Sequence, residues 1–252
     1  MIYVLEDTSK AAPLFSGWEE TLLYSCLEKI MGHICVTDLQ APASAFAYVG
    51  CFGFFAGVPE EALLDAVPEG YSILAPQNEA WAALIEARFA QAKKITRYAI
   101  RKDTRFDRDL LRQYVAALPE GYVLRPIDGA LYEQCLLSPV TCDFVSSFAS
   151  KEQYLALGRG FVILKDGRIV SGASSYTRYT SGIEIEVDTV REERRKHLAL
   201  TACAALILHC LEEGLYPSWD AHNPGSVRLA EMLGYAPAHP YVAYELDHRP
   251  KK

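Results

Sequence analysis

The sequence predicts an α/β (α+β) fold, a mixed and mostly antiparallel central sheet flanked by helices and preceded by a smaller α/β domain. Three observations predict it. Residues 160–179 indicate a hairpin, because two apolar runs flank an Asp-Gly turn pair. Gly182–Thr189 alternates between apolar and polar residues, as a half-buried strand does. Arg194–Glu213 has the length and apolar content of a long helix.

Composition narrows the class of protein. The 252 residues are 50% hydrophobic and 23% charged, which is typical of a globular chain of one large or two small domains. The formal net charge of −7 argues against bulk attraction to nucleic acid or to an anionic membrane. We therefore expect neither partner.

Cysteine usage and the apolar runs indicate the compartment. There are seven cysteines without a C-x-x-C pair, and most lie in apolar segments, which predicts reduced, buried thiols. The most apolar stretches, Ala45–Val58 and Leu198–Leu211, are too short to span a bilayer. Residues 1–10 lack a signal-type apolar core. We expect a soluble cytoplasmic protein with no metal site, since no His/Cys/Asp spacing is typical of one.

The first half alternates helical and strand patterns. Ser16 followed by Glu19 predicts a capped helix start, and apolar residues at helical spacing come after it. In this half we expect helices over 16–31, 59–66, 78–89 and 106–118, and strands over 33–39, 45–55, 71–75 and 94–101. Residues 119–121 (Pro-Glu-Gly) interrupt the last helix, which predicts two domains, 1–119 and 120–252.

The second half predicts the order β-α-α-β-β-β-α-β-α-β, and its hairpins and two crossovers predict the mixed sheet. The expected strands are 122–127, 160–165, 168–179, 182–189, 216–220 and 241–246, and the expected helices are 130–137, 144–157, 194–213 and 223–233. Asn223 is an expected helix cap with Pro224 in the first turn.

The most informative unit is the strand 182–189, a basic turn and the long helix. The first N–H groups of a helix lack intrahelical partners, and the helix dipole favours an anion beside them. Four bases surround this terminus: Arg191, Arg194, Arg195 and Lys196. Two interpretations fit this segment alone, a site for an anion such as a pyrophosphate or a solvated helix start that is salt-bridged with Glu192 and Glu193.

Four motifs between about Gly121 and Leu246 resemble the GNAT superfamily of acetyl-CoA-dependent N-acetyltransferases. They are GFVILKDGRIVSGASS, IEIEVDT, RRKHLA and WDAHNPGSVRLAEMLGY. Within that superfamily the chain resembles the branch with the zwittermicin-resistance-type acetyltransferases. The resemblance implies an acetyl-CoA-dependent N-acetyltransferase, in which a small amine-bearing molecule attacks the thioester directly.

The resemblance also implies which residues hold the co-substrate acetyl-CoA. The family's basic turn, Gln/Arg-x-x-Gly-x-Gly/Ala, corresponds to Arg194 through Ala199, and His197 stands where glycine is usual. Backbone amides there would hold the pyrophosphate, and Val187 would bond the pantetheine arm. The implied cofactor-binding residues are Val187, Arg194, Arg195, Lys196, His197, Leu198, Ala199, Asn223 and Ser226.

An attacking amine with an ordinary pKa of about 10 must first lose a proton, and a carboxylate can accept it. Alternation places Glu184, Glu186 and Asp188 on one face of their strand. Our first choice for the catalytic base is Glu186 and the second is Glu184; the alternative is an acidic face that is merely solvated. Many relatives have a tyrosine general acid where this chain has Ala230, so Ser226, Tyr235 or water are left as alternatives.

Two further questions stay open at this point. The rival function is a non-catalytic acyl-CoA-binding sensor or scaffold, and a homodimer is compatible with either function. A spacing of 145 residues separates both Tyr71 from Tyr216 and Asn78 from Asn223. The first domain is therefore either a degenerate copy of the second or an unrelated α/β cap.

Overall fold

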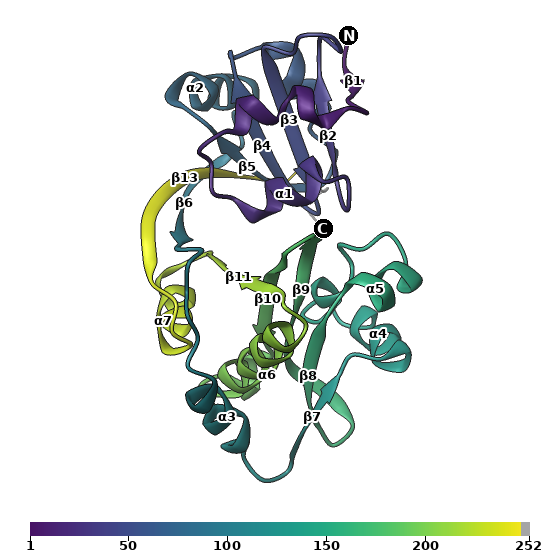
Figure 1. The fold of residues 1–252 in the computed structure, drawn as a ribbon, viewed down its shortest axis with the longest axis vertical. Coiled ribbons are helices and arrows are strands. Elements are labelled where there is room, and N and C mark those ends of the chain that lie inside the picture. The colour runs from purple at the N-terminus through teal and green to yellow at the C-terminus, as the bar shows by residue number, and fades with distance from the viewer. Residues whose placement is uncertain (248–252) are drawn as a thin grey trace. The chain divides into compact units, whose positions relative to one another are not determined.

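The computed structural model describes residues 1–247, and they divide into two compact units (Figure 1). The first unit contains Met1–Arg97 and the final strand from Pro240 onward, and the second contains Tyr98–His239. Two long strands, β6 (Lys93–Ile100) and β13 (Pro237–Asp247), each continue from one unit into the other.

The first unit contains a mixed sheet. Its strands, in spatial order, are β1 (Tyr3–Val4), β2 (His33–Val36), β3 (Ser44–Val49), β4 (Phe52–Gly57), β5 (Tyr71–Pro76) and the end of β13. Neighbouring strands are antiparallel except β4 and β5, which are parallel. The C-terminal strand completes this sheet by pairing Tyr244 with Leu74 and Leu246 with Ser72.

Short helices accompany that sheet, and one of them closes its core. They are η1 (Thr8–Lys10), η2 (Ala12–Phe15), α1 (Thr21–Leu27), η3 (Glu61–Ala66) and α2 (Glu79–Arg88). Asn78 caps α2 by accepting a hydrogen bond from the Trp81 amide at 3.0 Å. The Trp81 side chain is fully buried in one apolar cluster with Phe55 and Leu246.

The second unit repeats the same pairing pattern in a five-stranded sheet. Its strands, in order, are β11 (Tyr216–Ser218), β10 (Gly182–Thr189), β9 (Arg168–Tyr179), β8 (Gly160–Lys165) and β7 (Tyr122–Pro126). The pairs are antiparallel except β10 and β11, which are parallel. Within the same unit the end of β6 pairs with β12 (Asp220–Ala221). The predicted fold class is confirmed.

Helices of the second unit surround this sheet (Figure 1). They are α3 (Arg108–Ala116), α4 (Gly129–Leu136), η4 (Cys142–Phe144), α5 (Lys151–Leu157), η5 (Arg191–Glu193), α6 (Leu198–Glu212) and α7 (Pro224–Met232). The largest apolar cluster joins Ile183 and Ile185 of β10 to Cys203 and Leu206 of α6. Within residues 1–247 no helix has the length and apolar character needed to cross a membrane.

The structure divides the chain at a different point from the predicted boundary between residues 119 and 120. Helix α3 belongs to the second unit, because Leu111 is buried in the cluster around α6. The Thr201 hydroxyl also donates to the Tyr114 carbonyl oxygen at 3.0 Å. The Pro-Glu-Gly break ends that helix without separating two units.

Five predicted segments are divided or shortened. Residues 45–55 form two strands, because Gly50 has a left-handed φ of 60° and turns the chain. Ser150 caps α5, which separates it from η4, and Trp219 separates β11 from β12. Of the helix expected over 16–31 only α1 forms, and Glu20 rather than Ser16 stands at its N-cap position; the helix expected from residue 194 begins at Leu198. The helix expected over 59–66 is 3-10 in geometry.

Because the C-terminal strand β13 completes the sheet of the first unit, a core mutation in this strand should destabilise the first unit. Replacement of buried Leu246 with alanine removes methyl groups from the first unit's core and should destabilise that unit by about 2–5 kcal/mol. Hydrogen exchange should show faster exchange of the β5 amides 72–74 while the α6 amides stay protected. The exposed Met232→Ala is the control, and lost protection in α6 with β5 unchanged would contradict the assignment.

Candidate functional site

The central feature of the second unit is the separation of β10 from β11. Among the described residues, β11 pairs with β10 only at Gly182–Glu184, whereas β9 stays paired with β10 as far as Thr189. After Ser218 the chain leaves β10 and enters β12, which pairs with β6 instead. From Ile185 onward one edge of β10 is therefore open.

The backbone register shows which amides face that open edge. The Val190 amide donates to the Val170 carbonyl of β9 at 2.9 Å, and hydrogen-bonded pairs alternate along an antiparallel ladder. The amides of Val187 and Thr189 therefore point away from β9. The Val187 amide donates to Glu186 Oε1 at 3.1 Å and the Thr189 amide to Asp188 Oδ1 at 2.6 Å.

The turn between β10 and α6 forms an open helix terminus. The first helical hydrogen bond runs from the Thr201 amide to the His197 carbonyl, at 3.0 Å. The three amides before it, those of Leu198, Ala199 and Leu200, lie ahead of the ladder at the positive end of the helix dipole. Within residues 1–247 the His197 side chain makes no capping hydrogen bond to them. This geometry suits an anion.

His197 retains the backbone shape for which glycine is usual. Its φ is 60° and that of Arg195 is 64°, both in the left-handed region. A side chain there costs about 1–2 kcal/mol per residue, and the cost recurs at both positions. The imidazole is exposed, so the departure from glycine changes the side chain while the turn keeps the expected conformation.

The bases at the turn have different roles. Arg194 Nε donates to the Thr189 carbonyl at 3.0 Å and its Nη2 lies 3.3 Å from Asp188 Oδ1, which ties the turn to the end of β10. Lys196 Nζ bonds Glu193 Oε2 at 2.6 Å. Arg191 and Arg195 are exposed at the surface of the turn.

Glu193 anchors the turn, and its ion pair with Lys196 agrees with the alternative of a salt-bridged helix start. Its carboxylate accepts from Lys165 Nζ at 2.8 Å, from Lys196 Nζ at 2.6 Å and from the Tyr122 hydroxyl. These bonds hold the pKa of Glu193 down at about 2, and the bond to Glu193 raises the pKa of each lysine. The i, i+3 spacing of Glu193 and Lys196 was a local signal, but the partners on β7 and β8 were not predictable from it.

The two candidate carboxylates lie at the point of separation. Ile183 and Ile185 pack against α6, so alternation places Glu184 and Glu186 on the opposite face, as predicted. Glu184 is 4% exposed and lies between Thr177 of β9 and Ser218 of β11, both fully buried. Glu186 is more exposed and pairs with Ser174. The catalytic roles of both carboxylates stay predictions.

One neighbour of Glu186 was not anticipated. The Tyr154 hydroxyl of α5 lies 2.9 Å from Ser174 Oγ, and both side chains are buried. Because Ser174 pairs with Glu186 across the sheet, Tyr154 is held on the same face as the candidate base. The sequence offered no signal for this contact, since it predicted only a helix around Tyr154.

The residues predicted beyond β11 line the other side of the separation. Asn223 Oδ1 accepts from the Gly225 amide at 2.8 Å and the Ser226 amide at 3.0 Å, so its capping role is confirmed. Ser226 Oγ accepts from Trp219 Nε1 at 3.1 Å, which leaves the serine proton available to donate. Tyr235 donates to the Pro217 carbonyl, and burial raises its pKa well above the ordinary value, so it is a poor proton donor to a ligand.

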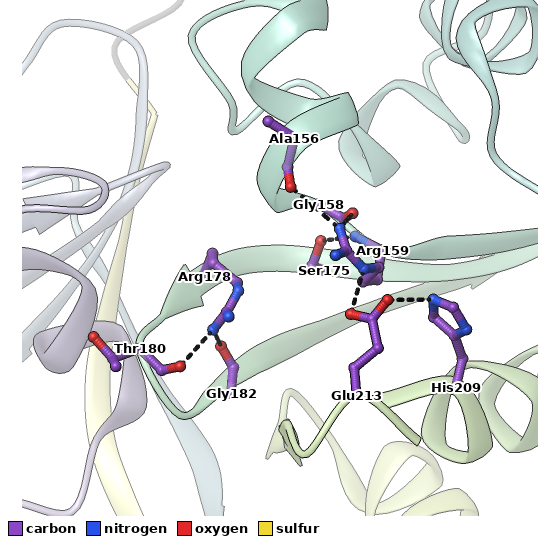
Figure 2. Close-up of polar contacts among 9 residues, drawn as sticks. All are labelled: Ala156, Gly158, Arg159, Ser175, Arg178, Thr180, Gly182, His209 and Glu213. Atoms are coloured by element: carbon purple, nitrogen blue, oxygen red, sulfur yellow. Dashed lines mark hydrogen bonds and ion pairs between the residues drawn. The ribbon is translucent and has the colours of Figure 1, made fainter. Parts of the chain in front are cut away.

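Two separate groups of polar contacts lie near the other end of β10, around Arg159 and around Arg178 (Figure 2). Arg159 Nε bonds Glu213 Oε2 at 2.7 Å, and His209 Nε2 lies 3.3 Å from the other oxygen of the same carboxylate. Arg178 Nη1 donates to the Gly182 carbonyl at 2.9 Å, at the start of β10. His209 therefore belongs to the group around Glu213, and burial raises the pKa of the adjacent Cys210 thiol to about 12, which makes this thiol a poor nucleophile.

The corresponding strand edge in the first unit is closed. There β4 stays paired with β5 as far as Phe55 and Pro76. The Gln77 side chain then accepts from the Gly57 amide at 2.9 Å, and Trp81 Nε1 donates to the Gly57 carbonyl at 3.0 Å. Glu60 and Glu61 come after this strand, where the second unit has bases.

Comparison with known proteins agrees with this geometry. A family model described as GNAT acetyltransferase matches residues 12–244. A GCN5-related N-acetyltransferase-like protein from Streptococcus suis 89/1591 is 48% identical, with a TM-score of 0.91, over 95% of this chain and 98% of that one. A tandem GNAT protein from the clavulanic acid biosynthesis pathway covers 100% of both chains with a TM-score of 0.54, but at 12% identity the likeness shows the fold alone.

A curated relative matches part of the chain. It is a Bacillus subtilis (strain 168) protein named as the uncharacterized N-acetyltransferase YdfB, 33% identical over 140 residues. The match covers 50% of this chain and 49% of that protein, so the chain spans about half the length of the curated relative it matches.

The Glu193 anchor predicts a pH-dependent stability. Glu193→Gln should lower the urea midpoint at pH 7, because a neutral amide loses charge-assisted bonds to two ammonium groups. The folded pKa of about 2 lies below the unfolded value of about 4.3, so the contribution is complete above about pH 5 and is lost as the pH falls toward 2. Urea unfolding at pH 7, 5, 4 and 3 measures this.

The exposed neighbour Glu192→Gln is the matched control and should leave the midpoint unchanged. The gap between wild type and Glu193→Gln should be constant from pH 7 to 5 and narrow below pH 4. A gap that persists undiminished at pH 3 would contradict the assignment.

Proposed function

Because the chain belongs to the GNAT acetyltransferase family, we propose that it is an acetyl-CoA-dependent N-acetyltransferase acting on a small amine-bearing molecule. The observation that supports this most is the open edge of β10 ending at the N-terminus of α6, whose first amides precede the first helical hydrogen bond. A strand edge offers amides to an extended amide-containing chain, and the helix terminus offers amides to a diphosphate.

Acetyl-CoA supplies an activated acetyl thioester when it is bound. The residues suited to hold it are the amides of Val187, Leu198 and Ala199, with Arg195 as an exposed cation and His197 shaping the turn. Arg194 and Lys196 contribute by holding the turn in place through Asp188 and Glu193. Asn223 presents α7 and places Ser226 at the opposite side of the separation.

The proposed chemistry needs one base, one oxyanion donor and one proton source. Glu186 accepts a proton from the substrate ammonium, directly or through water, and Glu184 is the alternative base. As the C–N bond forms and the C–S bond breaks, a backbone amide near Val187, other than the one that holds the pantetheine arm, stabilises the oxyanion. The attacking nitrogen gives up its second proton as the amide forms, and the departing thiolate takes one from the Ser226 hydroxyl or from water, which regains its own from that nitrogen.

Several finer assignments are part of the proposal. The quoted motifs support the branch with the zwittermicin-resistance-type enzymes, and a homodimer is compatible with the chain. Five of the seven cysteines in the described residues are buried free thiols, which supports a reducing, cytoplasmic location. We propose no nucleic-acid, membrane or metal partner.

The alternative is a non-catalytic acyl-CoA sensor. Ala230 favours it, since the position usual for a tyrosine acid is a fully buried alanine. The two functions differ in one observable: both bind CoA, and only the enzyme releases thiol when acetyl-CoA is mixed with a panel of amines.

We also infer that the first unit is a degenerate copy of the second. Both sheets have three antiparallel pairs followed by one parallel pair, and the 145-residue spacing relates β5 to β11 and α2 to α7. The closed edge at Gly57 and the acidic turn after it leave this copy without a site for the coenzyme.

The catalytic proposal predicts the effect of removing the base. Glu186→Gln should lower kcat by roughly 10²–10⁴-fold, because the carboxamide cannot accept the proton. The KM for acetyl-CoA should change by less than about threefold. Thiol release measures both constants, and Glu184→Gln is the matched variant. If Glu184→Gln abolishes turnover while Glu186→Gln does not, the two roles are exchanged.

The degenerate-copy proposal predicts a stoichiometry of about one CoA per chain by titration calorimetry. Ala199→Asp places a carboxylate beside the α6 amides and should weaken CoA binding by roughly tenfold or more through charge repulsion. Ala62→Asp makes the same change in η3 of the first unit and should leave the affinity unaltered. Two equivalents per chain, or strong binding that survives Ala199→Asp, would contradict it.

A further inference from the structure

The open edge of β10 is covered by the strand's own acids. The two amides that face the opening, those of Val187 and Thr189, each donate to the carboxylate of the preceding residue. Before the separation the neighbouring strand uses this edge: the Tyr216 amide donates to the Ser181 carbonyl, just before β10, at 2.7 Å. Acidic side chains therefore accept hydrogen bonds from the edge amides of β10 beyond the point where β11 ends its pairing.

We propose that Glu186 and Asp188 are placeholders, which cover the open edge until the pantetheine arm of the coenzyme replaces them at the two amides. The proposal rests on the proposed function. An amide hydrogen faces one acceptor at good geometry, so the Glu186 carboxylate and a ligand carbonyl compete for the Val187 N–H. Binding of the arm must displace Glu186 from that position.

The displacement links coenzyme binding to the state of the base. A carboxylate oxygen that accepts a hydrogen bond from an N–H is a weaker base, because the bond favours its charged form. Once the arm takes the amide, the Glu186 carboxylate loses that bond and becomes the better proton acceptor. The proton is therefore taken from the amine after the thioester is in place. The Glu186 carboxylate covers the Val187 amide before binding and accepts the proton after it.

The covering also explains why Glu186 and Asp188 occupy the end of this strand. An uncovered strand edge is a template for pairing with another chain, and charged side chains are a common protection. Asp188 additionally holds Arg194 at 3.3 Å, so its removal would disturb the turn as well as the edge. Glu186 is therefore the residue on which the placeholder can be tested cleanly.

The experiment compares the affinities of CoA and of pantetheine for four proteins. These are wild type, Glu186→Ala, Glu186→Gln and Glu192→Ala. Glu186→Ala removes the competing carboxylate and should tighten both ligands by roughly three- to tenfold, the effect of one net hydrogen bond. Glu186→Gln retains a weaker, neutral acceptor and should tighten them less. Glu192→Ala removes an equal charge from the turn between β10 and α6, at a residue that bonds neither the Val187 nor the Thr189 amide.

Pantetheine distinguishes competition for the Val187 amide from charge repulsion, because it has no phosphate for the carboxylates to repel. Tightening of CoA by both alanine variants, with pantetheine unaffected, would show a charge effect and overturn the proposal. The direct readout is the amide NMR resonance of Val187, which should shift in Glu186→Ala without ligand and on addition of pantetheine to wild type. A Val187 resonance that is the same in wild type and Glu186→Ala would also overturn it.

The outcomes distinguish this proposal from the proposed function. If wild type binds neither CoA nor pantetheine at millimolar concentration, and Glu186→Ala does not bind them either, the coenzyme site itself is wrong. If wild type binds CoA and Glu186→Ala binds it no more tightly, the site stands and the placeholder role is wrong. Thermal unfolding of each variant without ligand confirms that the comparison is between folded proteins.

Discussion

The separation of the parallel strands β10 and β11 is the constraint on which the second unit depends. Strand β11 stays beside β10 for three residue pairs and then leaves at Trp219, whose indole bonds Ser226 on the next helix. The parting exposes backbone amides that a regular sheet would have consumed. Exposed amides in a sheet are costly unless something accepts from them, and here either acids of the strand or a ligand can do so.

A parting of this kind persists only if both ends of the strand are fixed. At one end Arg178 bonds the first residue of β10, and Arg159 ties the adjoining loop to Glu213 at the end of α6 (Figure 2). At the other end Arg194 donates to the Thr189 carbonyl, and the Glu193 carboxylate accepts hydrogen bonds from two lysines and a tyrosine. Charged groups thus maintain the ends, while apolar contacts with α6 fix the middle.

The sequence predicted the features that depend on neighbouring residues. The hairpin 160–179, the strand 182–189 and the Asn223 cap arise from turn chemistry and periodicity, and the structure has them as predicted. The features that it could not predict depend on distant partners. Glu193 meets Tyr122 across 71 positions, and the last strand completes the first unit's sheet because Leu246 is buried there, which no local pattern encodes.

The open edge of β10 and the closed edge of β4 differ in only a few side chains. Both have a parallel strand pair and then an asparagine-capped helix, and they differ in the side chains just beyond the last paired residues. In the first unit Gln77 continues the ladder with its side chain, and Trp81 reaches the last carbonyl of β4. In the second unit Trp219 turns away and bonds the helix instead. At the 145-residue spacing Gln77 and Trp81 correspond to His222 and Ser226 of the second unit, so different side chains stand at the two positions that close the edge in the first unit.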